Sequence, residues 1–326
     1  MASRAQTTSG TSEPHAPPHR KSPEKSERES AAHDAANESQ SRGIDEKSIV
    51  QFTGFATAYF RAAESCRSDR IIDDPFAEKL AGDIGAQFMA FLSRWGPSQD
   101  SAVDMLAIRT RYLDEALDNR NPAIKQIVNL ACGMDSRAFR LDAMRECHVF
   151  ELDRSEDMLS HKQRTLREIG AEAKAKRIDY IVADLADDAW EQELSAHGFD
   201  PKQPTFWIME GLLYYLDRSS IVRLLKTVDA HSAPGSQLWV DMCGQSTIGS
   251  ERYGIEGLKF GEDNPTGGIL SLLYWDLKVV ASLEEPGTHF GREWTPMPLS
   301  DDSNESLKWF IVEGSKPANR DAPPVL

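Results

Sequence analysis

The chain has 326 residues, of which 40% are hydrophobic, and this is ample for one large α/β domain with additions. Its formal net charge of -15 would repel a phosphate backbone, so a nucleic-acid partner is not expected. The four cysteines are scattered without C-x-x-C spacing, which disfavours a disulfide framework and a metal site and favours a reducing compartment.

Residues 1–45 form a tail that is rich in Ser, Glu, Pro, Ala and Lys and contains no Phe, Trp, Tyr, Leu or Val. Such a segment cannot bury enough apolar surface to offset the entropy of ordering, so we expect it to be disordered. It also lacks the apolar stretch of a secretory signal, and its glutamates disfavour a mitochondrial presequence. Because the chain has no run of about 18 apolar residues, we expect a cytoplasmic protein without a membrane span.

Residues 46–120 carry three predicted helices, which we group as an N-terminal helical cap. Apolar side chains recur at helical spacing from Ile49 to Phe60, and the Asp74-Pro75-Phe76 segment is typical of a helix start. A third helix is expected over about 101–117, where apolar residues again share one face.

Residues 121–243 alternate between short apolar runs and helical segments, and we assign them to a cofactor-binding core. The predicted strands are Gln126–Leu130, His148–Leu152, Tyr180–Ala183, Thr205–Met209 and Gln237–Asp241. Helices are expected between them, notably over Ser155–Ile169 and Arg218–His231. Alternation of this kind predicts an α/β fold with a doubly wound, parallel sheet and helices on both faces.

The remainder of the chain departs from this alternation. Residues 244–275 contain many glycines, and we expect an inserted flexible lid that closes over a small pocket. Residues 276–326 carry two last strands, Lys278–Ser282 and Lys308–Val312, joined by a Gly/Pro-rich link from Pro286 to Pro298.

Carboxylates follow five successive predicted strands, at the edge of an α/β sheet where ligands bind. These acidic residues are Asp135 after the first strand, Glu151 and Asp153, Asp184, Glu210, and Asp241. The pattern predicts an acidic rim, answered by a lone cation. A neutral or cationic ligand with many hydroxyl and amino donors would suit this rim, whereas a pyrophosphate would not.

The first strand runs into a turn of small residues, as in nucleotide-binding folds, but the glycines of a dinucleotide site are missing. The three positions of G-x-G-x-x-G are Ala131, Gly133 and Ser136 here, which disfavours an NAD-dependent oxidoreductase. S-adenosyl-L-methionine carries no phosphate, has a positive sulfonium and presents donors to carboxylates. It therefore matches the predicted rim.

Four motifs occur in the order and spacing typical of leucine carboxyl methyltransferase-like enzymes. They are NLACGMDSRAFRL (129–141), FELD (150–153), ADL (183–185) and EGLLYYL (210–216). The upstream AESCRSDRIIDDPFAEKLAG and IRTRYLDEAL resemble the branch of S-adenosyl-L-methionine-dependent O-methyltransferases often linked to secondary metabolism. The similarity extends from about Thr57 to the C-terminus.

This resemblance implies a Rossmann-like methyltransferase sheet of about seven strands, with the last one antiparallel. It implies S-adenosyl-L-methionine as the cofactor and methyl transfer to a carboxylate or hydroxyl of a small molecule. It also implies that Arg109 grips the methionine carboxylate of the cofactor, because a guanidinium can bind a carboxylate in two-pronged fashion. Arg61 is expected to add a second cation to the same group.

The remaining cofactor contacts are also implied by the family pattern. Ala131 and Gly133 match the turn against the methionyl part, although many members have Gly at the first of these positions. Asp153 matches the acid that holds both ribose hydroxyls. Asp184 and Leu185 match the residues around the adenine. Glu210 matches the carboxylate near the methionine amino group. Asp184 is also a residue type that favours a helix N-cap.

The sequence identifies no catalytic base, and this favours a carboxylate or an acidic phenol as the methyl acceptor. Two alternatives stay open: a protein C-terminal carboxyl methyltransferase, and a catalytically silent binding protein of the same fold. The latter would not bring Arg109, Asp153 and Glu210 to one cavity. We expect a small-molecule partner, with a monomer favoured over an oligomer.

Overall fold

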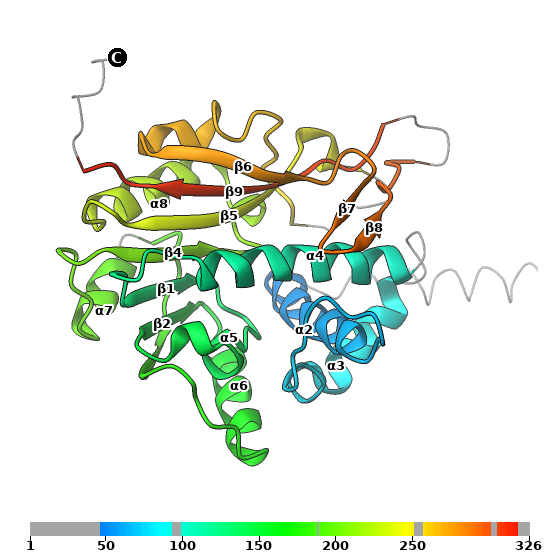
Figure 1. Ribbon diagram of the computed structural model, residues 1–326, viewed down its shortest axis with the longest axis horizontal. Helices are drawn as coiled ribbons and strands as arrows, with labels where there is room; N and C mark the ends of the chain where they lie inside the picture. Colours follow the sequence, from blue (N-terminus) through cyan, green and yellow to red (C-terminus); the bar gives the residue numbers. More distant parts are fainter. Residues whose placement is uncertain (1–45, 93–98, 188, 251–256, 301–304, 319–326) are drawn as a thin grey trace, which may run out of the picture. The chain divides into compact units, whose positions relative to one another are not determined.

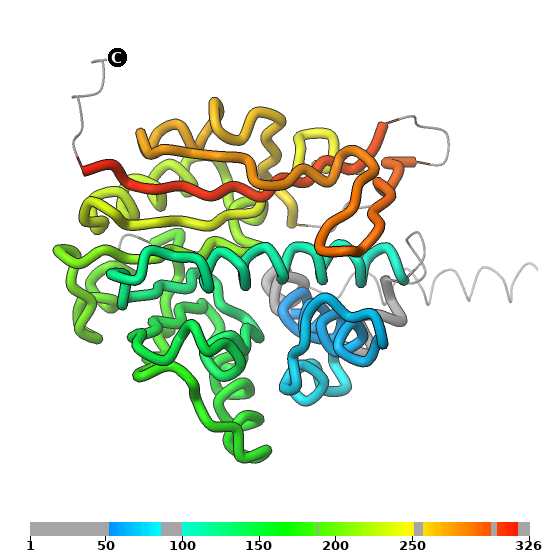
Figure 2. Tube along the Cα trace, in the orientation of Figure 1, coloured from blue at the N-terminus to red at the C-terminus, as the bar shows by residue number. Residues whose placement is uncertain are grey.

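The computed structural model describes residues 46–92, 99–187, 189–250, 257–300 and 305–318 (Figure 1). The predicted disordered tail, residues 1–45, lies outside the described residues. Three long helices come first, as predicted: α2 (Glu46–Ser65), α3 (Ala77–Leu92) and α4 (Gln99–Asp118). Helices α2 and α3 lie side by side, and α4 runs across one face of the sheet (Figures 1 and 2).

A seven-stranded sheet with the order β3-β2-β1-β4-β5-β9-β6 forms the centre of the molecule. Its strands are β1 (Gln126–Leu130), β2 (His148–Asp153), β3 (Arg177–Val182), β4 (Thr205–Met209), β5 (Gln237–Cys243), β6 (Asp276–Ser282) and β9 (Trp309–Ser315). Strands β1 to β5 pair in parallel, whereas β9 runs antiparallel to both β5 and β6. The prediction of a doubly wound, Rossmann-like sheet with its last strand antiparallel is confirmed.

The connecting helices cover both faces of this sheet (Figure 1). They are α5 (Arg137–Arg140), α6 (Glu156–Glu168), α7 (Trp190–Ala196) and α8 (Arg218–Ala230), with short 3-10 turns η1 (Asp142–Met144), η2 (Leu213–Tyr215), η3 (Gln245–Thr247) and η4 (Ile269–Leu273). Side-chain caps set two of the helix starts. Ser155 Oγ accepts a hydrogen bond from Met158 N at 3.2 Å, and Asp217 Oδ1 accepts one from Ser220 N at 2.9 Å.

Alternating strand residues build two separate cores, one on each face of the sheet. In β1, Val128 packs into the core under α7 and α8, whereas the preceding Ile127 packs into the core under α2 to α6. Trp207 of β4 and Trp239 of β5 are fully buried on these two opposite faces. Successive side chains of a strand point to opposite faces of the sheet, so an almost continuously apolar strand contributes to both cores.

The Pro286–Pro298 link differs from the prediction, because it contains a second small sheet rather than only a loop. Strands β7 (Gly287–His289) and β8 (Arg292–Trp294) pair as an antiparallel hairpin. Phe290 and Gly291 form the two-residue turn, with φ of 55° and 82°. Two positive φ values match a type I′ turn, whose twist suits a hairpin.

The segment assigned to a lid packs against the sheet domain over much of its length. Phe260, Ile269, Leu270 and Leu273 are buried in the core that contains α8. The backbone N–H of Lys259 donates to the Tyr214 carbonyl oxygen at 2.7 Å. Residues 251–256 of this segment lie outside the described residues.

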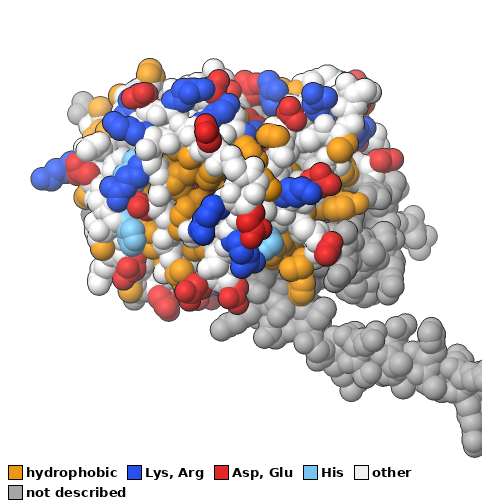
Figure 3. Space-filling model, turned by 90° about the horizontal axis from the view of Figure 1, so that it is seen from below, with side chains coloured by type: hydrophobic (Ala, Val, Ile, Leu, Met, Phe, Trp, Pro, Cys, Tyr) orange, Lys and Arg blue, Asp and Glu red, His pale blue; other side chains and the backbone are white. Residues whose placement is uncertain are grey.

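The surface of the molecule carries both signs of charge. On the face that Figure 3 shows, acidic and basic side chains are interspersed. None of the helices in the described ranges is long and apolar enough to cross a membrane.

Candidate cofactor site

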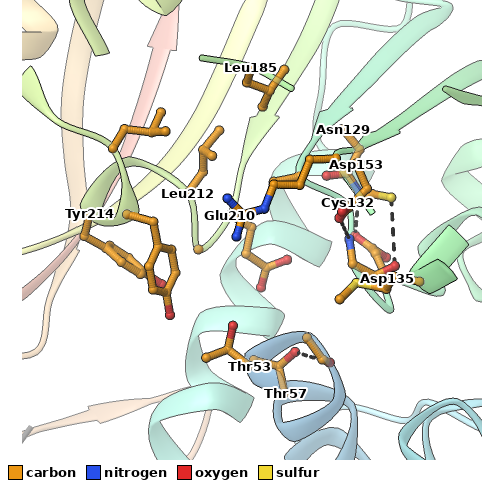
Figure 4. Close-up of a pocket in the computed structure, with 18 of the residues that line it drawn as sticks. Thr53, Thr57, Asn129, Cys132, Asp135, Asp153, Leu185, Glu210, Leu212 and Tyr214 are labelled. Carbon is orange, nitrogen blue, oxygen red and sulfur yellow. Dashed lines mark hydrogen bonds between the residues drawn. The ribbon is translucent and has the colours of Figure 1, made fainter. Parts of the chain in front are cut away.

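A cavity of about 250 Å³ lies at the carboxyl ends of the parallel strands, and helix α2 lines one side of it (Figure 4). All eight residues that the family resemblance implies as cofactor contacts line it: Arg61, Arg109, Ala131, Gly133, Asp153, Asp184, Leu185 and Glu210. Because these residues come from α2, α4 and the carboxyl ends of the four strands β1 to β4, only the folded chain brings them together. The cavity is thus the place where the predicted contacts could act as one site.

The turn after β1 forms the floor of this cavity and has an unusual backbone. Ala131 and Gly133 both have positive φ, at 59° and 46°. An alanine in this left-handed region costs about 1–2 kcal/mol relative to right-handed backbone. The turn is tied to β2, because Cys132 N donates to the Leu152 carbonyl oxygen at 2.8 Å and Gly133 N donates to Asp153 Oδ2 at 3.0 Å.

Asp153 ends β2 and is 8% exposed. Its Oδ2 accepts the hydrogen bond from Gly133 N, and its Oδ1 accepts one from Ser155 N at 3.0 Å. Burial raises the pKa of Asp153, and these two N–H donors oppose the shift. An ionised carboxylate has about four lone-pair sites, so Asp153 keeps capacity for two hydroxyl donors in the cavity.

Glu210 follows β4 and lines the cavity (Figure 4), and its carboxylate pairs with two guanidinium groups. Its Oε1 lies 3.1 Å from Arg109 Nε, and its Oε2 lies 2.7 Å from Arg137 Nη1. Burial opposes ionisation of Glu210, but Arg137 and Arg109 outweigh it and hold the pKa of this carboxyl below its usual value. Glu210 is therefore a fixed negative charge at the cavity wall.

Arg109, on α4, is held by a second acid at the end of β5. Its Nη1 lies 3.3 Å from Asp241 Oδ2 and donates a longer bond of 3.4 Å to the Tyr214 hydroxyl. Asp241 also accepts hydrogen bonds from Gly211 N at 2.6 Å and from Trp309 Nε1 at 3.0 Å. Asp241 is fully buried, so its contacts make it a structural support for Arg109.

Arg61, on α2, joins the N-terminal helices to the turn after β1. Its Nε pairs with Asp74 Oδ2 at 2.9 Å, and its Nη2 donates to the Met134 carbonyl oxygen at 2.6 Å. Ser136 Oγ donates to the same Asp74 oxygen at 2.7 Å. These contacts fix α2 as one wall of the cavity.

Apolar side chains line the far end of the cavity, where Leu185 and Leu212 lie opposite Thr53 and Thr57 (Figure 4). Asp184 is exposed there, and its Oδ1 accepts a hydrogen bond from Ala186 N at 2.9 Å. This carboxylate does not cap the next helix, because α7 begins at Trp190. It closes a local turn beside the cavity instead.

The prediction of an acidic rim with a lone cation is wrong, because several arginines balance the negative charge of the carboxylates. Among the described residues, the side chains of four arginines are buried around the site: Arg61, Arg109, Arg137 and Arg140. Arg137 alone pairs with Asp114, Asp135 and Glu210, each at 2.7 Å. Burial favours this balance, since an unpaired buried charge is costly. The sequence did not reveal it, because SRAFRL resembles an ordinary helix with exposed arginines.

Sequence reasoning expected only Arg61 of α2 at the site and missed Thr53, Gly54 and Thr57, which also line the cavity. A Cβ atom on Gly54 would lie 3.3 Å from the Met158 sulfur and 3.8 Å from Gly133 Cα. A glycine within a predicted amphipathic helix was the available signal, because it permits close approach of another backbone.

Comparisons with known proteins agree on one family. The family described as leucine carboxyl methyltransferase matches residues 54–229, which is more than half of the chain. A protein of Mycolicibacterium smegmatis named "Putative S-adenosyl-L-methionine-dependent methyltransferase" is 41% identical over 224 residues, covering 65% of this chain and 68% of that protein. A Streptomyces coelicolor protein with the same description is 33% identical over 291 residues, covering 82% of this chain and 94% of that protein.

A solved structure shares the fold at low sequence identity. A duf574 family protein from Streptomyces avermitilis has a TM-score of 0.52 and 13% identity, covering 81% of this chain and 97% of that chain. At this identity the likeness concerns the fold alone.

Proposed function

This chain belongs to the leucine carboxyl methyltransferase family and is an S-adenosyl-L-methionine-dependent methyltransferase, and we propose that it methylates a carboxylate or hydroxyl oxygen of a small molecule in secondary metabolism. The observation that carries this proposal is the convergence of Arg109, Asp153 and Glu210 on one cavity. The same convergence argues against a catalytically silent binding protein.

The residues of the cavity fit the cofactor. Asp153 keeps lone pairs for two ribose hydroxyls, and Glu210 presents an ionised carboxylate to the methionine amino group. Arg109 and Arg61 are the cations available for the methionine carboxylate, and Leu185 offers an apolar contact to the adenine. Ala131 and Gly133, in the turn after β1, allow close approach to the methionyl part of the cofactor. Asp184, in the turn after β3, lies beside the adenine and completes the proposed cofactor contacts.

When bound, S-adenosyl-L-methionine supplies a methyl group on a positively charged sulfur, which is a good leaving group. The task of this chain is then to orient the cofactor and the acceptor and to exclude water. Asp153 and Glu210 hold two separate parts of the cofactor, and so they restrict its position. Orientation of this kind contributes about 7–11 kcal/mol to lowering a bimolecular barrier.

The described part of the cavity favours an acceptor that is already ionised. Its described lining contains no histidine, and Glu210 is engaged by arginines. The two tyrosines stay protonated and are poor bases, because burial raises the pKa of Tyr215 to about 12 and holds the pKa of Tyr214 well above its usual value. A carboxylate or an acidic phenol would react without a base, whereas an alcohol would need one.

A small acceptor is favoured by the walls around the Tyr214 end of the cavity. Helix α2 lines one side, where Thr53 is hydrogen-bonded to Tyr215, and Lys259 of the 244–275 segment lines another. We propose that residues 244–275 act as a lid over this end. Methylation of a protein C-terminus, the second candidate, would need a wider cleft.

The cofactor assignment is tested by thermal unfolding in the presence of S-adenosylhomocysteine or NAD. A ligand at 100 times its dissociation constant stabilises the native state by about 2.7 kcal/mol, which raises the melting temperature measurably. We expect a shift with S-adenosylhomocysteine, and Asp153→Ala should abolish it while the protein stays folded. A shift with NAD alone would overturn the assignment.

The acceptor class is tested with methyl-labelled cofactor and cell extract separated into small molecules and proteins. If mild alkali releases the label from the small-molecule fraction, the products are methyl esters and the acceptor is a carboxylate. If the label resists alkali, the products are methyl ethers and the acceptor is a hydroxyl. Label that appears only in the protein fraction would support the second candidate instead.

A further inference from the structure

Arg137 is the most extensively bound charged side chain at the site, although it does not line the cavity. It is 3% exposed and lies in the four-residue helix α5. Its Nε donates to Asp114 Oδ1 at 2.7 Å, its Nη1 donates to Asp135 Oδ2 at 2.7 Å, and its Nη2 donates to the Thr110 carbonyl oxygen at 3.4 Å. The guanidinium is thus fixed from α4 and from the turn after β1.

The same Nη1 atom also donates to Glu210 Oε2 at 2.7 Å, and Glu210 does line the cavity. Arg109 is a weaker support for this carboxylate. Its Nε lies 3.1 Å from Glu210 Oε1, but among the described residues this atom has no partner in hydrogen-bond geometry. The directional contact that sets the Glu210 carboxylate comes from Arg137.

We propose that Arg137 is a positioning residue for S-adenosyl-L-methionine, which holds the Glu210 carboxylate in the one orientation that receives the amino group of the methionine part. This inference rests on the role of Glu210 in the proposed function. Arg137 acts through Glu210 and touches no substrate itself. A guanidinium suits this role because its rigid fork can serve several carboxylates while staying charged.

Two further features support a role beyond packing. The Arg137 backbone N–H donates to Asp135 Oδ1 at 2.7 Å, so the same acid fixes both the main chain and the side chain of Arg137. Asp135 is itself held by Asn129 Nδ2 at 2.9 Å, from the end of β1. The position of Glu210 is thereby tied to the turn that contacts the methionyl part of the cofactor.

Arg140 provides a matched control on the same short helix. It binds the same Asp114 carboxylate as Arg137, at 2.6 and 2.7 Å, and it is equally buried. Its other acidic neighbour is Asp74, at 4.0 Å, rather than Glu210. Replacing Arg140 therefore disturbs the buried ion network without removing the contact that the inference concerns.

The test compares two ligands by calorimetry on the full chain: S-adenosylhomocysteine, and 5′-methylthioadenosine, which lacks the amino and carboxyl groups. Arg137→Gln should weaken S-adenosylhomocysteine about tenfold or more, the usual effect of losing a hydrogen bond to a charged group. Its affinity for 5′-methylthioadenosine should stay within about twofold of the wild type. Arg140→Gln should leave the ratio of the two affinities unchanged.

The conservative variant Arg137→Lys keeps the charge and should recover part of the preference for S-adenosylhomocysteine over 5′-methylthioadenosine. If Arg137→Gln does not fold, Arg137→Lys is compared with the wild type in its place. An equal loss for both ligands, or an unchanged ratio in both Arg137 variants, would overturn the inference and leave the proposed function standing. A wild-type protein that binds neither ligand would overturn both.

Discussion

Lys162 Nζ lies 2.7 Å from Glu151 Oε2, and neither side chain is more than 1% exposed. The pair connects α6 to β2 beneath the turn that forms the floor of the cavity. We expect Lys162→Met to destabilise the protein by about 3–5 kcal/mol, because it leaves the Glu151 charge buried without a partner. Denaturant unfolding measures this loss.

The double variant Lys162→Met with Glu151→Leu is the control, since it removes both charges. It should recover much of the lost free energy of unfolding, as replacement of a whole buried pair by apolar residues often does. A double variant that is as unstable as Lys162→Met alone would contradict the assignment of the loss to an unpaired charge.

Asp74 should give the stability a distinct acid dependence. Burial opposes its ionisation, but Arg61 and Arg140 outweigh this and lower the pKa of Asp74 below 3.8. A carboxyl with a lowered folded-state pKa stabilises the protein above its unfolded-state pKa and loses this contribution as the pH falls through the folded-state value. The difference in unfolding free energy between wild type and Asp74→Asn should therefore shrink as the pH falls from about 5 to about 2. A difference that stays constant over this range would contradict the ion pairing.

The central strands were predictable because their apolar runs are short, buried on both faces and bounded by turn residues. β1 and β4 match the predicted bounds at both ends. β3 begins at Arg177, three residues before the predicted start, because it is an edge strand whose first residues are partly exposed. The hairpin of β7 and β8 escaped prediction, since strands of three residues show no periodicity.

The site was predictable where a strand end fixes a side chain and unpredictable where tertiary packing does. Asp153 ends β2 and Glu210 directly follows β4, so strand positions alone place them at one edge. Arg137 and Gly54 lie on helices, and nothing local shows that one reaches Glu210 and the other meets the turn at Gly133. The charge balance of the site depends on such contacts, and so composition could not give it.

The left-handed backbone at Ala131 predicts opposite effects for a smaller and a larger side chain. Ala131→Gly relieves about 1–2 kcal/mol of backbone strain but adds about 0.5–1 kcal/mol of unfolded-state entropy, so stability should rise slightly or stay unchanged. Ala131→Val should lose at least about 1 kcal/mol, because a β-branched residue rarely adopts φ near 59°. Thermal unfolding of both variants checks this, and equal stabilities for the two would contradict the strained turn.

Gly54 sets the distance between α2 and the turn after β1, and its replacement should affect ligand binding more than folding. Alanine is favoured over glycine in a helix by about 1 kcal/mol, which offsets the contact of the new methyl with the flexible Met158 side chain. Gly54→Ala should therefore change the free energy of unfolding by less than about 1 kcal/mol. Because Gly54 lines the cavity, the affinity for S-adenosylhomocysteine should fall with side-chain size, and Gly54→Leu should lose about tenfold or more. If Gly54→Leu bound this ligand as tightly as the wild type, α2 would not form the wall of the cofactor site.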